Sequence, residues 1–310
     1  MALSRRSLLA SAAAAPLLPL ATQAAAGGHS AKAPAPLARS FAVGDMTVTT
    51  LLAGSGMRDE PQGTFGMNVS AEEFARVSEE NFISSETYQG FFTPVLVETG
   101  SETILFDTGL PGDGVPMALE SVGLTPADIT HVVITHMHPD HIGGLTGDGG
   151  ATYANASYVT GAREYNFWTS GPGSQSGLAG QINEKVVPFA ERMRFLDEGG
   201  EVRPGITAMG AFGHTPGHMA YMLSSGGAQL LITADMANHH VWSLANPDWE
   251  VRFDADKAAA AATRRRILGM LAADRIPMVG YHMPFPAAGY VETRGDGFHW
   301  VPVTYQMAAT

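Results

Sequence analysis

The chain has 310 residues and a formal net charge of −12, with 18 basic against 30 acidic side chains. This balance argues against nucleic acid as a partner, because phosphate backbones bind surfaces rich in Lys and Arg. The chain contains no cysteine, which excludes disulfides, thiolate metal ligands and a cysteine nucleophile. Its hydrophobic content of 45% is sufficient for a sizeable core.

Residues 1–26 have the features of an export signal. Arg5 and Arg6 precede an apolar run that ends near Leu20, and alanines follow at 24–26. The paired arginines predict a twin-arginine-type signal peptide, and therefore a periplasmic or secreted protein. The apolar run is too short for a membrane span, so we expect no stable membrane insertion after cleavage. The alternative is an uncleaved anchor.

The rest of the chain alternates between strand-like and helix-like patterns. Residues 27–40, rich in Ala, Gly and Pro, predict a flexible lead-in, and 41–310 a single domain. Strands are expected at 46–52, 93–98, 103–107, 131–135, 229–233 and 276–280. Helices are expected at 70–80, which begins with a Ser-x-x-Glu capping box, from Thr125 onward, and at 256–273. This alternation predicts a layered α/β fold.

Two further segments allow a local interpretation. Residues 171–180 are rich in Gly and Ser, and we expect a mobile loop that is either a lid over a site or a connection. Arg264, Arg265 and Arg266 lie within the helical pattern, and we interpret them as a solvated helix face.

Residues 135–144 contain the most informative motif of the chain. Four metal-binding side chains occur within it: His136, His138, Asp140 and His141. Imidazole and carboxylate bind zinc and similar divalent ions while leaving a coordination position open. The motif follows a predicted strand and precedes a Gly-Gly turn, a place where loops on a rigid sheet position functional groups. It therefore predicts a metal site rather than a polar surface loop.

Further ligand candidates occur in the second half of the chain. The turn Gly-His-Thr-Pro-Gly-His contains His214 and His218, and Asp235 and His282 each follow a predicted strand. Together, His-x-His-x-Asp-His, Thr-Pro-Gly-His, the strand-end Asp and the late His resemble the metallo-β-lactamase-fold hydrolases over essentially the whole mature chain. The resemblance implies a four-layer αββα sandwich and two divalent metal ions. Zinc is the first expectation, with manganese, iron or cobalt as alternatives.

Carried over position by position, the resemblance assigns a role to each ligand. It implies that one ion is held by His136, His138 and His218, that the second is held by Asp140, His141 and His282, and that Asp235 bridges them. His214 is then a supporting residue, and Asp107 is expected to orient a ligand histidine from a buried position. For His239 and His240, which are close enough in sequence to line the pocket, a structural role is favoured.

Two ions about 3.5–4 Å apart can share a hydroxide that attacks the substrate and can polarise the substrate oxygen. The resemblance therefore implies hydrolysis of a carbonyl or phosphoryl centre. Asp140 and Asp235 are the carboxylates placed for general acid–base work.

Differences from other groups with the metallo-β-lactamase fold restrict the expected class of substrate. Asp235 stands where metallo-β-lactamases typically have Cys or Ser, and His138 where flavodiiron proteins have Glu, so β-lactam cleavage and redox chemistry are not expected. Segments 164–168, 280–286 and 297–305 resemble the exported branch that contains methyl parathion hydrolase and acyl-homoserine lactonases. In that branch the tryptophan, here Trp168, belongs to an aromatic substrate pocket. The other expected pocket residues are Phe91, Phe92, Trp242 and Phe285.

Within this branch we expect a lactone or carboxylic ester as the substrate, with an acyl-homoserine lactone first, which would make the protein a quorum-quenching lactonase. Phosphotriester turnover is expected as a side activity. The alternative is an organophosphate or aryl ester hydrolase, and the alternative of another class is a non-catalytic metal- or ligand-binding protein. Asn238 stands where small lactonases have a tyrosine, so assistance to the leaving group must come from elsewhere. The expected partner is a small molecule, and a homodimer is the commonest closed assembly.

Overall fold

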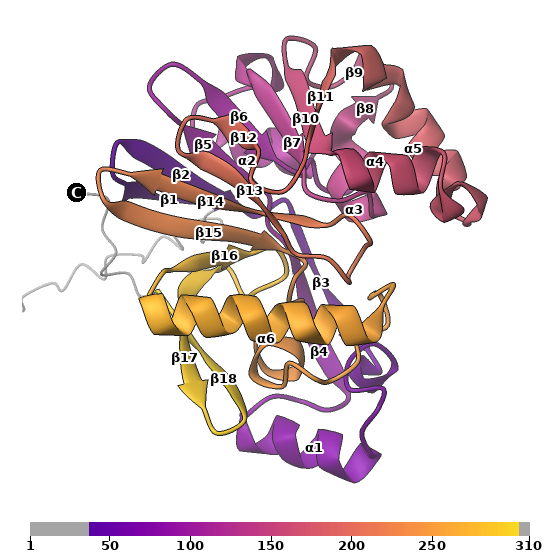
Figure 1. Cartoon of the computed structure of the whole chain (residues 1–310), viewed down its shortest axis with the longest axis vertical. Helices are drawn as coiled ribbons and strands as arrows, with labels where there is room; N and C mark the ends of the chain where they lie inside the picture. The colour runs from indigo at the N-terminus through magenta and orange to yellow at the C-terminus, as the bar shows by residue number, and fades with distance from the viewer. Residues whose placement is uncertain (1–36, 304–310) are drawn as a thin grey trace, which may run out of the picture. The chain divides into compact units, whose positions relative to one another are not determined.

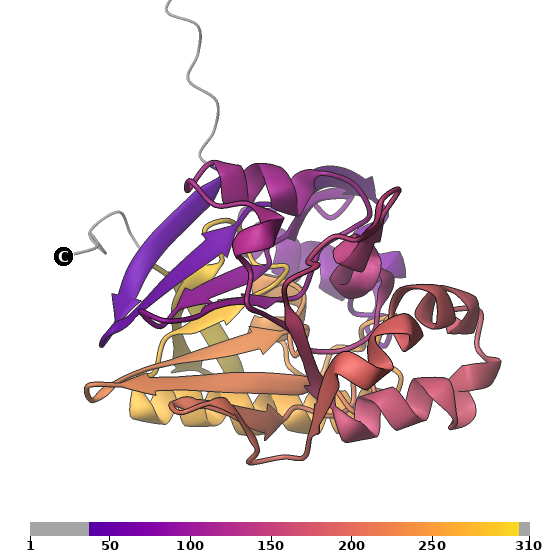
Figure 2. The ribbon, with the colours of Figure 1, turned by 90° about the horizontal axis from the view of Figure 1, so that it is seen from above.

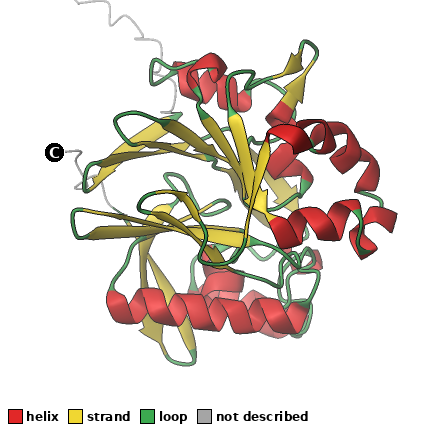
Figure 3. Cartoon of the chain, turned by 45° about the horizontal axis from the view of Figure 1, so that its top comes forward, coloured by secondary structure: helices red, strands yellow, loops and turns green. Residues whose placement is uncertain are grey.

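Two β-sheets of seven strands each dominate residues 37–303, the part of the chain that the computed structural model describes. The sheets face each other, and helices lie on their outer sides (Figure 1, Figure 2). Figure 3 shows the same order of helix, strand, strand and helix layers by element type. The predicted four-layer αββα sandwich is therefore confirmed.

The first sheet is antiparallel at one edge and parallel at the other. Its order is β1-β2-β5-β6-β7-β10-β11, with parallel pairing from β6 onward. The interior strand β7 is buried at its three apolar residues, as expected for a parallel strand covered on both faces. The strands are β1 (Ala38–Val43), β2 (Met46–Leu51), β5 (Val95–Glu98), β6 (Thr103–Phe106), β7 (His131–Ile134), β10 (Ser157–Gly161) and β11 (Met193–Leu196).

The second sheet follows the chain from β12 to β18. Only β15 and β16 pair in parallel within it, because helix α6 connects them as a crossover. The strands are β12 (Glu201–Arg203), β13 (Ile206–Gly210), β14 (Met219–Ser225), β15 (Ala228–Ala234), β16 (Met278–Gly280), β17 (Ala288–Arg294) and β18 (Gly297–Pro302). Two hairpins lie outside the sheets: β3 (Gly54–Asp59) with β4 (Thr87–Phe92), and β8 (Thr146–Gly147) with β9 (Gly150–Ala151).

Alternation along the strands divides the apolar side chains between two cores. Ile104 and Leu105 are neighbours on β6 and are both fully buried, yet Ile104 packs between the two sheets while Leu105 packs under the outer helices. Successive side chains of a strand point to opposite faces, so an entirely apolar strand supplies both cores at once. Because apolar side chains are buried on both of its faces, the sheet whose edge carries the candidate site is held firmly in place.

The helices are short except for α6, which lies along the outer face of the second sheet (Figure 1). They are α1 (Ala71–Glu80), α2 (Gly114–Glu120), α3 (Pro139–Ile142), α4 (Ala162–Thr169), α5 (Ala179–Lys185) and α6 (Lys257–Asp274). The 3₁₀ turns are η1 (Pro61–Gly63), η2 (Pro126–Asp128), η3 (Gly143–Leu145), η4 (Pro172–Gln175) and η5 (Val187–Arg192), and η6 (His240–Ala245) is a π-helix.

The helix predictions differ in outcome. Those at 70–80 and 256–273 are confirmed to within one residue, and side chains cap both helices: Ser70 accepts from Glu73 N–H at 3.2 Å and Asp256 accepts from Ala259 N–H at 2.9 Å. The helix expected from Thr125 is only the single turn η2. The chain enters strand β7 three residues later, which leaves no length for a helix.

Residues 171–180 are more ordered than the Gly- and Ser-rich composition predicts. The segment contains η4, and helix α5 begins within it at Ala179. Gly173 lies against the rings of Phe167 and Trp168, where an added Cβ would come within 2.7 and 2.8 Å of them. The glycine here allows close packing rather than mobility.

The domain boundary at 41 is placed slightly too late, because β1 begins at Ala38, inside the segment predicted as a lead-in. The predicted signal peptide and residues 27–36 lie outside the described residues. Among residues 37–303, no helix combines the length and the apolar character that crossing a bilayer requires.

Candidate metal centre

The motif of residues 136–141 lies where β7 ends. After Ile134 the chain continues into the short helix α3, whose first residue is Pro139, and Asp140 and His141 follow in its first turn. Proline suits the first helical position because its ring presets the backbone angle. The other candidates also follow strand ends: His214 lies between β13 and β14, Asp235 directly after β15, and His282 after β16. The fold thus brings residues from four connections to one edge of the sandwich.

The first group of candidate ligands contains three histidines. His136 Nε2 lies 3.1 Å from His138 Nδ1, and His138 Nδ1 lies 3.0 Å from His214 Nε2. One ligand atom from each of the three lies within 4.8 Å of the others. Such an arrangement of three imidazole nitrogens is typical of zinc sites that retain an open position.

The second group contains Asp140, His141, Asp235 and His282, with ligand atoms within the same 4.8 Å limit. His282 Nε2 lies 3.1 Å from Asp235 Oδ2 and 3.4 Å from Asp140 Oδ2. Asp235 also approaches the first group, since its Oδ2 lies 3.3 Å from His214 Nε2. Its position between the groups is that of a bridging carboxylate.

The residues of both groups fit divalent cations. His141 Nε2 and Asp235 Oδ1 are buried and 3.2 Å apart, yet neither has a hydrogen-bond partner in the described part of the chain. Buried polar atoms without partners are costly unless a ligand satisfies them. A cation between the two atoms would remove this cost, and imidazole with carboxylate is a donor set that zinc accepts.

Two candidate ligand histidines, His141 and His282, are oriented from behind through their Nδ1 atoms. Asp107 accepts from Thr135 N–H at 2.9 Å, Thr135 Oγ1 at 2.8 Å and His141 Nδ1 at 2.8 Å. His282 Nδ1 donates to the backbone oxygen of Phe91 at 2.7 Å. Each contact fixes the proton on Nδ1 and turns Nε2 toward the site. Asp107 therefore lies where the sequence predicts an orienting aspartate.

The roles predicted for His214 and His218 must be interchanged. The backbone N–H of Asp235 donates to His218 Nε2 at 3.1 Å, which occupies the lone pair that would bind a metal. His214 Nε2 instead faces His138 and Asp235, as described above. Both histidines belong to one tight turn, and the direction of each side chain depends on how that turn packs rather than on the spacing in the sequence.

Two residues behind His214, Asp254 and Arg264, were not predicted to support the site. Asp254 Oδ1 accepts from His214 Nδ1 at 2.9 Å, and Asp254 Oδ2 accepts from Arg264 at 2.7 Å. Arg264 is fully buried and also donates to the carbonyl oxygens of Pro247 and Trp249. The interpretation of the arginine run as a solvated face is therefore wrong for Arg264. Arg265, the next residue, is exposed as predicted.

The neighbouring arginines provide a matched stability test. We expect Arg264→Met to lower the free energy of unfolding by about 3–5 kcal/mol, because it leaves the buried Asp254 carboxylate without its partner. Arg265→Met breaks an exposed pair with Asp248 and should cost less than about 1 kcal/mol. Denaturant unfolding of the metal-loaded proteins measures both values. Equal losses in the two variants would contradict a structural role for Arg264.

Glu164, which was predicted only as part of a similar segment, connects the two histidine loops. It is fully buried, and its carboxylate accepts from Met137 N–H at 2.9 Å, Thr215 Oγ1 at 2.7 Å and Gly217 N–H at 3.0 Å. Since Met137 lies between two ligands and Thr215 follows His214, Glu164 holds these turns in register. A single Glu on the short helix α4 gives no sequence signal for this role.

The histidines differ in their affinity for protons. Burial by itself lowers the pKa of a histidine, but hydrogen bonds to Asp235 and Asp254 raise the pKa of His214 to about 9. Asp235 and Asp140 likewise outweigh burial and raise the pKa of His282 to about 10. Burial, assisted by His214, lowers the pKa of His138 to about 3. Near neutral pH, His214 and His282 therefore carry protons in the metal-free protein.

This difference predicts a pH dependence of metal binding. A cation must displace a proton from His214 in the first group and from His282 in the second, and both protons are present below about pH 9. His141 in the second group also carries a proton, because Asp235 and Asp107 outweigh burial and raise its pKa well above the ordinary value. Affinity for the ion of the first group should therefore rise roughly tenfold per pH unit between about pH 6 and pH 8, and affinity for the ion of the second group should rise more steeply. Competition with a chromophoric zinc chelator at several pH values measures it. A constant affinity over this range would contradict ligation by these two residues.

Comparison with known proteins agrees with this geometry. A family model for the metallo-beta-lactamase superfamily matches residues 93–278, which include β7, the motif at its end, His214 and Asp235. The chain belongs to the metallo-β-lactamase superfamily.

The individual proteins that the chain resembles share only a modest sequence identity with it. An N-acyl homoserine lactonase of a Bacillus species is 25% identical over 196 residues, 58% of this chain and 72% of the lactonase. Metallo-beta-lactamase domain-containing protein 1 of Xenopus laevis is 31% identical over 91 residues, so the match spans 29% of this chain and only 35% of that relative. The solved structure of AidC, a dizinc quorum-quenching lactonase, superposes with a TM-score of 0.78 at 25% identity. That superposition covers 87% of this chain and 99% of AidC.

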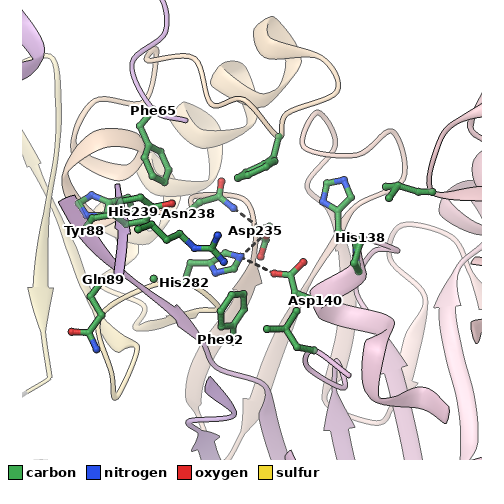
Figure 4. A pocket seen from close by; sticks show the side chains of 16 residues that line it. Phe65, Tyr88, Gln89, Phe92, His138, Asp140, Asp235, Asn238, His239 and His282 are labelled. Atoms are coloured by element: carbon green, nitrogen blue, oxygen red, sulfur yellow. Dashed lines mark hydrogen bonds and ion pairs between the residues drawn. The ribbon is translucent and has the colours of Figure 1, made fainter. Parts of the chain in front are cut away.

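A pocket of about 380 Å³ opens beside the two candidate ligand groups of this metallo-β-lactamase-superfamily protein. Figure 4 shows His138 and Asp140 on one side of it and Phe65, Tyr88 and His239 on the other, with Asp235 and His282 between. The apolar wall residues are Phe65, Phe92, Leu110, Leu178 and Phe253, and the polar ones include Arg58, Gln89 and Asn238. Leu178 places the segment 171–180 at the site.

Most of the aromatic residues predicted for the pocket lie elsewhere. Phe92 lines it, but Phe91 and Phe285 are not among its lining residues within 37–303. Phe91 precedes Phe92 on β4, so the two rings point to opposite faces. Trp168 is only 7% exposed and donates to Glu164 at 2.6 Å, and Trp242 is fully buried. Both tryptophans are core residues.

Proposed function

We propose that this protein is a hydrolase that opens the ester bond of a lactone that carries an apolar acyl chain, with acyl-homoserine lactones as the first candidates. The observation that carries the proposal is the pair of ligand groups sharing Asp235 at the end of a pocket with an apolar wall. The lactonase relatives support the same substrate class.

The ligand positions proposed are those that the geometry favours. One group is His136, His138 and His214, the other is Asp140, His141 and His282, and Asp235 lies between them. When bound, two divalent ions generate a nucleophile from water at neutral pH and polarise a carbonyl oxygen. Zinc is the expected metal because histidine and carboxylate are its ordinary ligands in open sites.

The remaining steps use side chains of this chain. Asp140 is partly exposed to the pocket, whereas Asp235 is only 3% exposed, so Asp140 is the carboxylate with room to exchange a proton with the substrate. The apolar residues Phe65, Leu178 and Phe253 would receive the acyl chain and exclude water from it.

A specific observation favours a second candidate. Asn238 Nδ2 donates to Asp235 Oδ2 at 2.9 Å, so its amide steadies the bridging carboxylate and supplies no acid for a departing alkoxide. Without a hydroxyl acid at position 238, the site acts best on leaving groups that need little protonation, such as aryl oxides. Aryl esters and aryl phosphotriesters are therefore the alternative substrates.

A substrate panel on zinc-loaded protein tests the proposal. It compares acyl-homoserine lactones of short and long chain, unsubstituted lactones, aryl esters and a dialkyl aryl phosphate, each with and without prior chelation. We expect the long-chain acyl-homoserine lactone to have the highest kcat/KM and chelation to abolish turnover. A faster aryl phosphate would reverse the order of the two candidates. Bound metal with no turnover of any substrate would leave only a binding function.

We also propose export through the twin-arginine-type signal of residues 1–26, which would place the activity outside the cytoplasm. Fractionation of cells that produce the full chain, compared with a variant carrying Lys at positions 5 and 6, tests this proposal. The variant is expected to remain in the cytoplasm.

A further inference from the structure

We infer that His239 is a specificity-determining residue whose Nε2–H binds an acceptor oxygen of the substrate chain, on the side of the pocket opposite the ligand groups. The inference rests on the proposed function and specifies which part of the substrate the pocket recognises. That feature is a carbonyl oxygen outside the scissile ester, as in the amide of an acylated amino-lactone.

The tautomer of His239 is fixed by its backbone surroundings. Its Nδ1 accepts from the N–H groups of Val241 and Trp242, each at 3.2 Å, at the start of η6. A backbone N–H can only donate, so Nδ1 cannot carry a proton. The proton of the neutral ring is therefore on Nε2. Burial, with a smaller effect of His240, holds the pKa of His239 well below its ordinary value, which keeps the ring neutral.

The ring is also held rigidly. It stacks on Trp242 with a centroid distance of 4.0 Å and an angle of 16°, and the Phe65 ring lies 5.5 Å away on another side. Trp242 is itself anchored, since its Nε1 donates to Ser78 Oγ at 3.0 Å. A donor whose direction is fixed before binding loses little conformational freedom when a ligand arrives.

The Nε2–H remains available to a ligand. No side-chain or backbone atom of residues 37–303 accepts a hydrogen bond from Nε2. In that range, some unpartnered polar atoms are completely buried, such as His218 Nδ1, but His239 Nε2 is not one of them. Since His239 is 7% exposed and lines the pocket, the accessible ring atoms face the pocket space. In Figure 4 His239 lies beside Tyr88 and Phe65, across the pocket from His138 and Asp140.

The pocket supplies a second hydrogen-bond donor, Arg58, for a substrate oxygen. Arg58, the cationic side chain of this wall, lies over Gly90, where an added Cβ would come within 3.2 Å of Arg58 Nε. Its guanidinium carbon is 5.7 Å from the centre of the Phe92 ring. Arg58 and His239 thus both present N–H groups, and a guanidinium has no acceptor. A substrate oxygen can therefore be satisfied at this wall.

Two substitutions separate the pocket contact from the structural contact of His239. In His239→Asn the side-chain oxygen can replace Nδ1 as acceptor at the start of η6, a position that Asn favours, but no group replaces Nε2. In His239→Gln the longer amide can reach the position of Nε2 and donate into the pocket, but it no longer caps η6. The pair therefore removes one contact at a time.

The experiment measures kcat/KM of zinc-loaded protein for two lactones of equal chain length. One is an N-acyl-homoserine lactone, and the other is a γ-lactone with a plain alkyl chain and no amide. We expect the wild-type preference for the amide substrate to fall roughly 3- to 10-fold in His239→Asn, the effect of one lost neutral hydrogen bond, with Tm nearly unchanged. His239→Gln should keep most of the preference while its Tm falls by a few degrees.

The outcomes are distinguishable. An unchanged preference in His239→Asn, with both lactones hydrolysed normally, would overturn this inference alone. Loss of preference only in His239→Gln, in step with its Tm, would also overturn it, because His239 would then act through the fold. No hydrolysis of either lactone by the wild-type protein would overturn the proposed function and this inference with it.

Discussion

Replacing Asp235 with Asn is expected to lower kcat/KM by about a thousandfold or more, or about 4 kcal/mol of transition-state stabilisation. Asn keeps the shape of the side chain and removes the negative charge that lies 3.1 Å from His282 and 3.3 Å from His214. Burial alone would raise the pKa of Asp235, but His282 and His141 hold the pKa well below its usual range. The carboxylate is therefore ionised, and its charge is what two cations would share.

The same substitution should reduce the metal content below two ions per chain. Asp256→Asn is the matched control, because it removes one carboxylate charge from an exposed helix cap that Asn serves equally well. Metal analysis and steady-state kinetics on both variants give the answer. Full activity and two bound ions in Asp235→Asn would show that this residue does not bridge.

The second large effect is expected from His214 rather than His218. His214→Ala removes a candidate ligand, and we expect the loss of one bound ion and a fall in kcat/KM of at least about a hundredfold. His218→Gln should retain both ions, because the glutamine oxygen can accept from Asp235 N–H as His218 Nε2 does at 3.1 Å. Its activity should remain within about tenfold of wild type.

The comparison depends on separating metal loss from misfolding. Metal content per folded chain, checked by circular dichroism, makes that separation, and His218→Ala provides a variant in which the fold contact is lost without a substitute. If the His218 variants lost an ion while His214→Ala retained two, the assignment from the sequence resemblance would be restored.

Local segments of the site could be predicted from the sequence alone. His136, His138, Asp140 and His141 lie within one turn and a short helix after a strand, so neighbours in the chain are also neighbours in space. Two helix caps were predictable for the same reason, since Ser70 and Asp256 bond to backbone atoms three residues away. Asp235 was predictable from its position at the end of an apolar strand.

Long-range partners could not be predicted in this way. Asp254 and Arg264 are ten residues apart and meet His214 from a different connection. Glu164 accepts hydrogen bonds from Thr215 and Gly217, which are 51 and 53 residues away in the sequence. The prediction of the aromatic pocket residues was wrong for a related reason. Phe65 and Phe253 occur in irregular segments without periodicity, whereas the conspicuous Trp168 and Trp242 are large enough that packing takes them into the core.

The sequence by itself therefore determined the kind of site. A cluster of histidine and aspartate after one strand end, further candidates at later strand ends and the lack of cysteine together indicate a metal site with nitrogen and oxygen ligands. Only the tertiary structure decided which of His214 and His218 faces the ligand groups, which residues orient them, and that the neutral ring of His239 points its N–H into the pocket. The physical reason is that spacing fixes which residues a turn contains, while the direction of each side chain depends on the backbone and the packing around that turn.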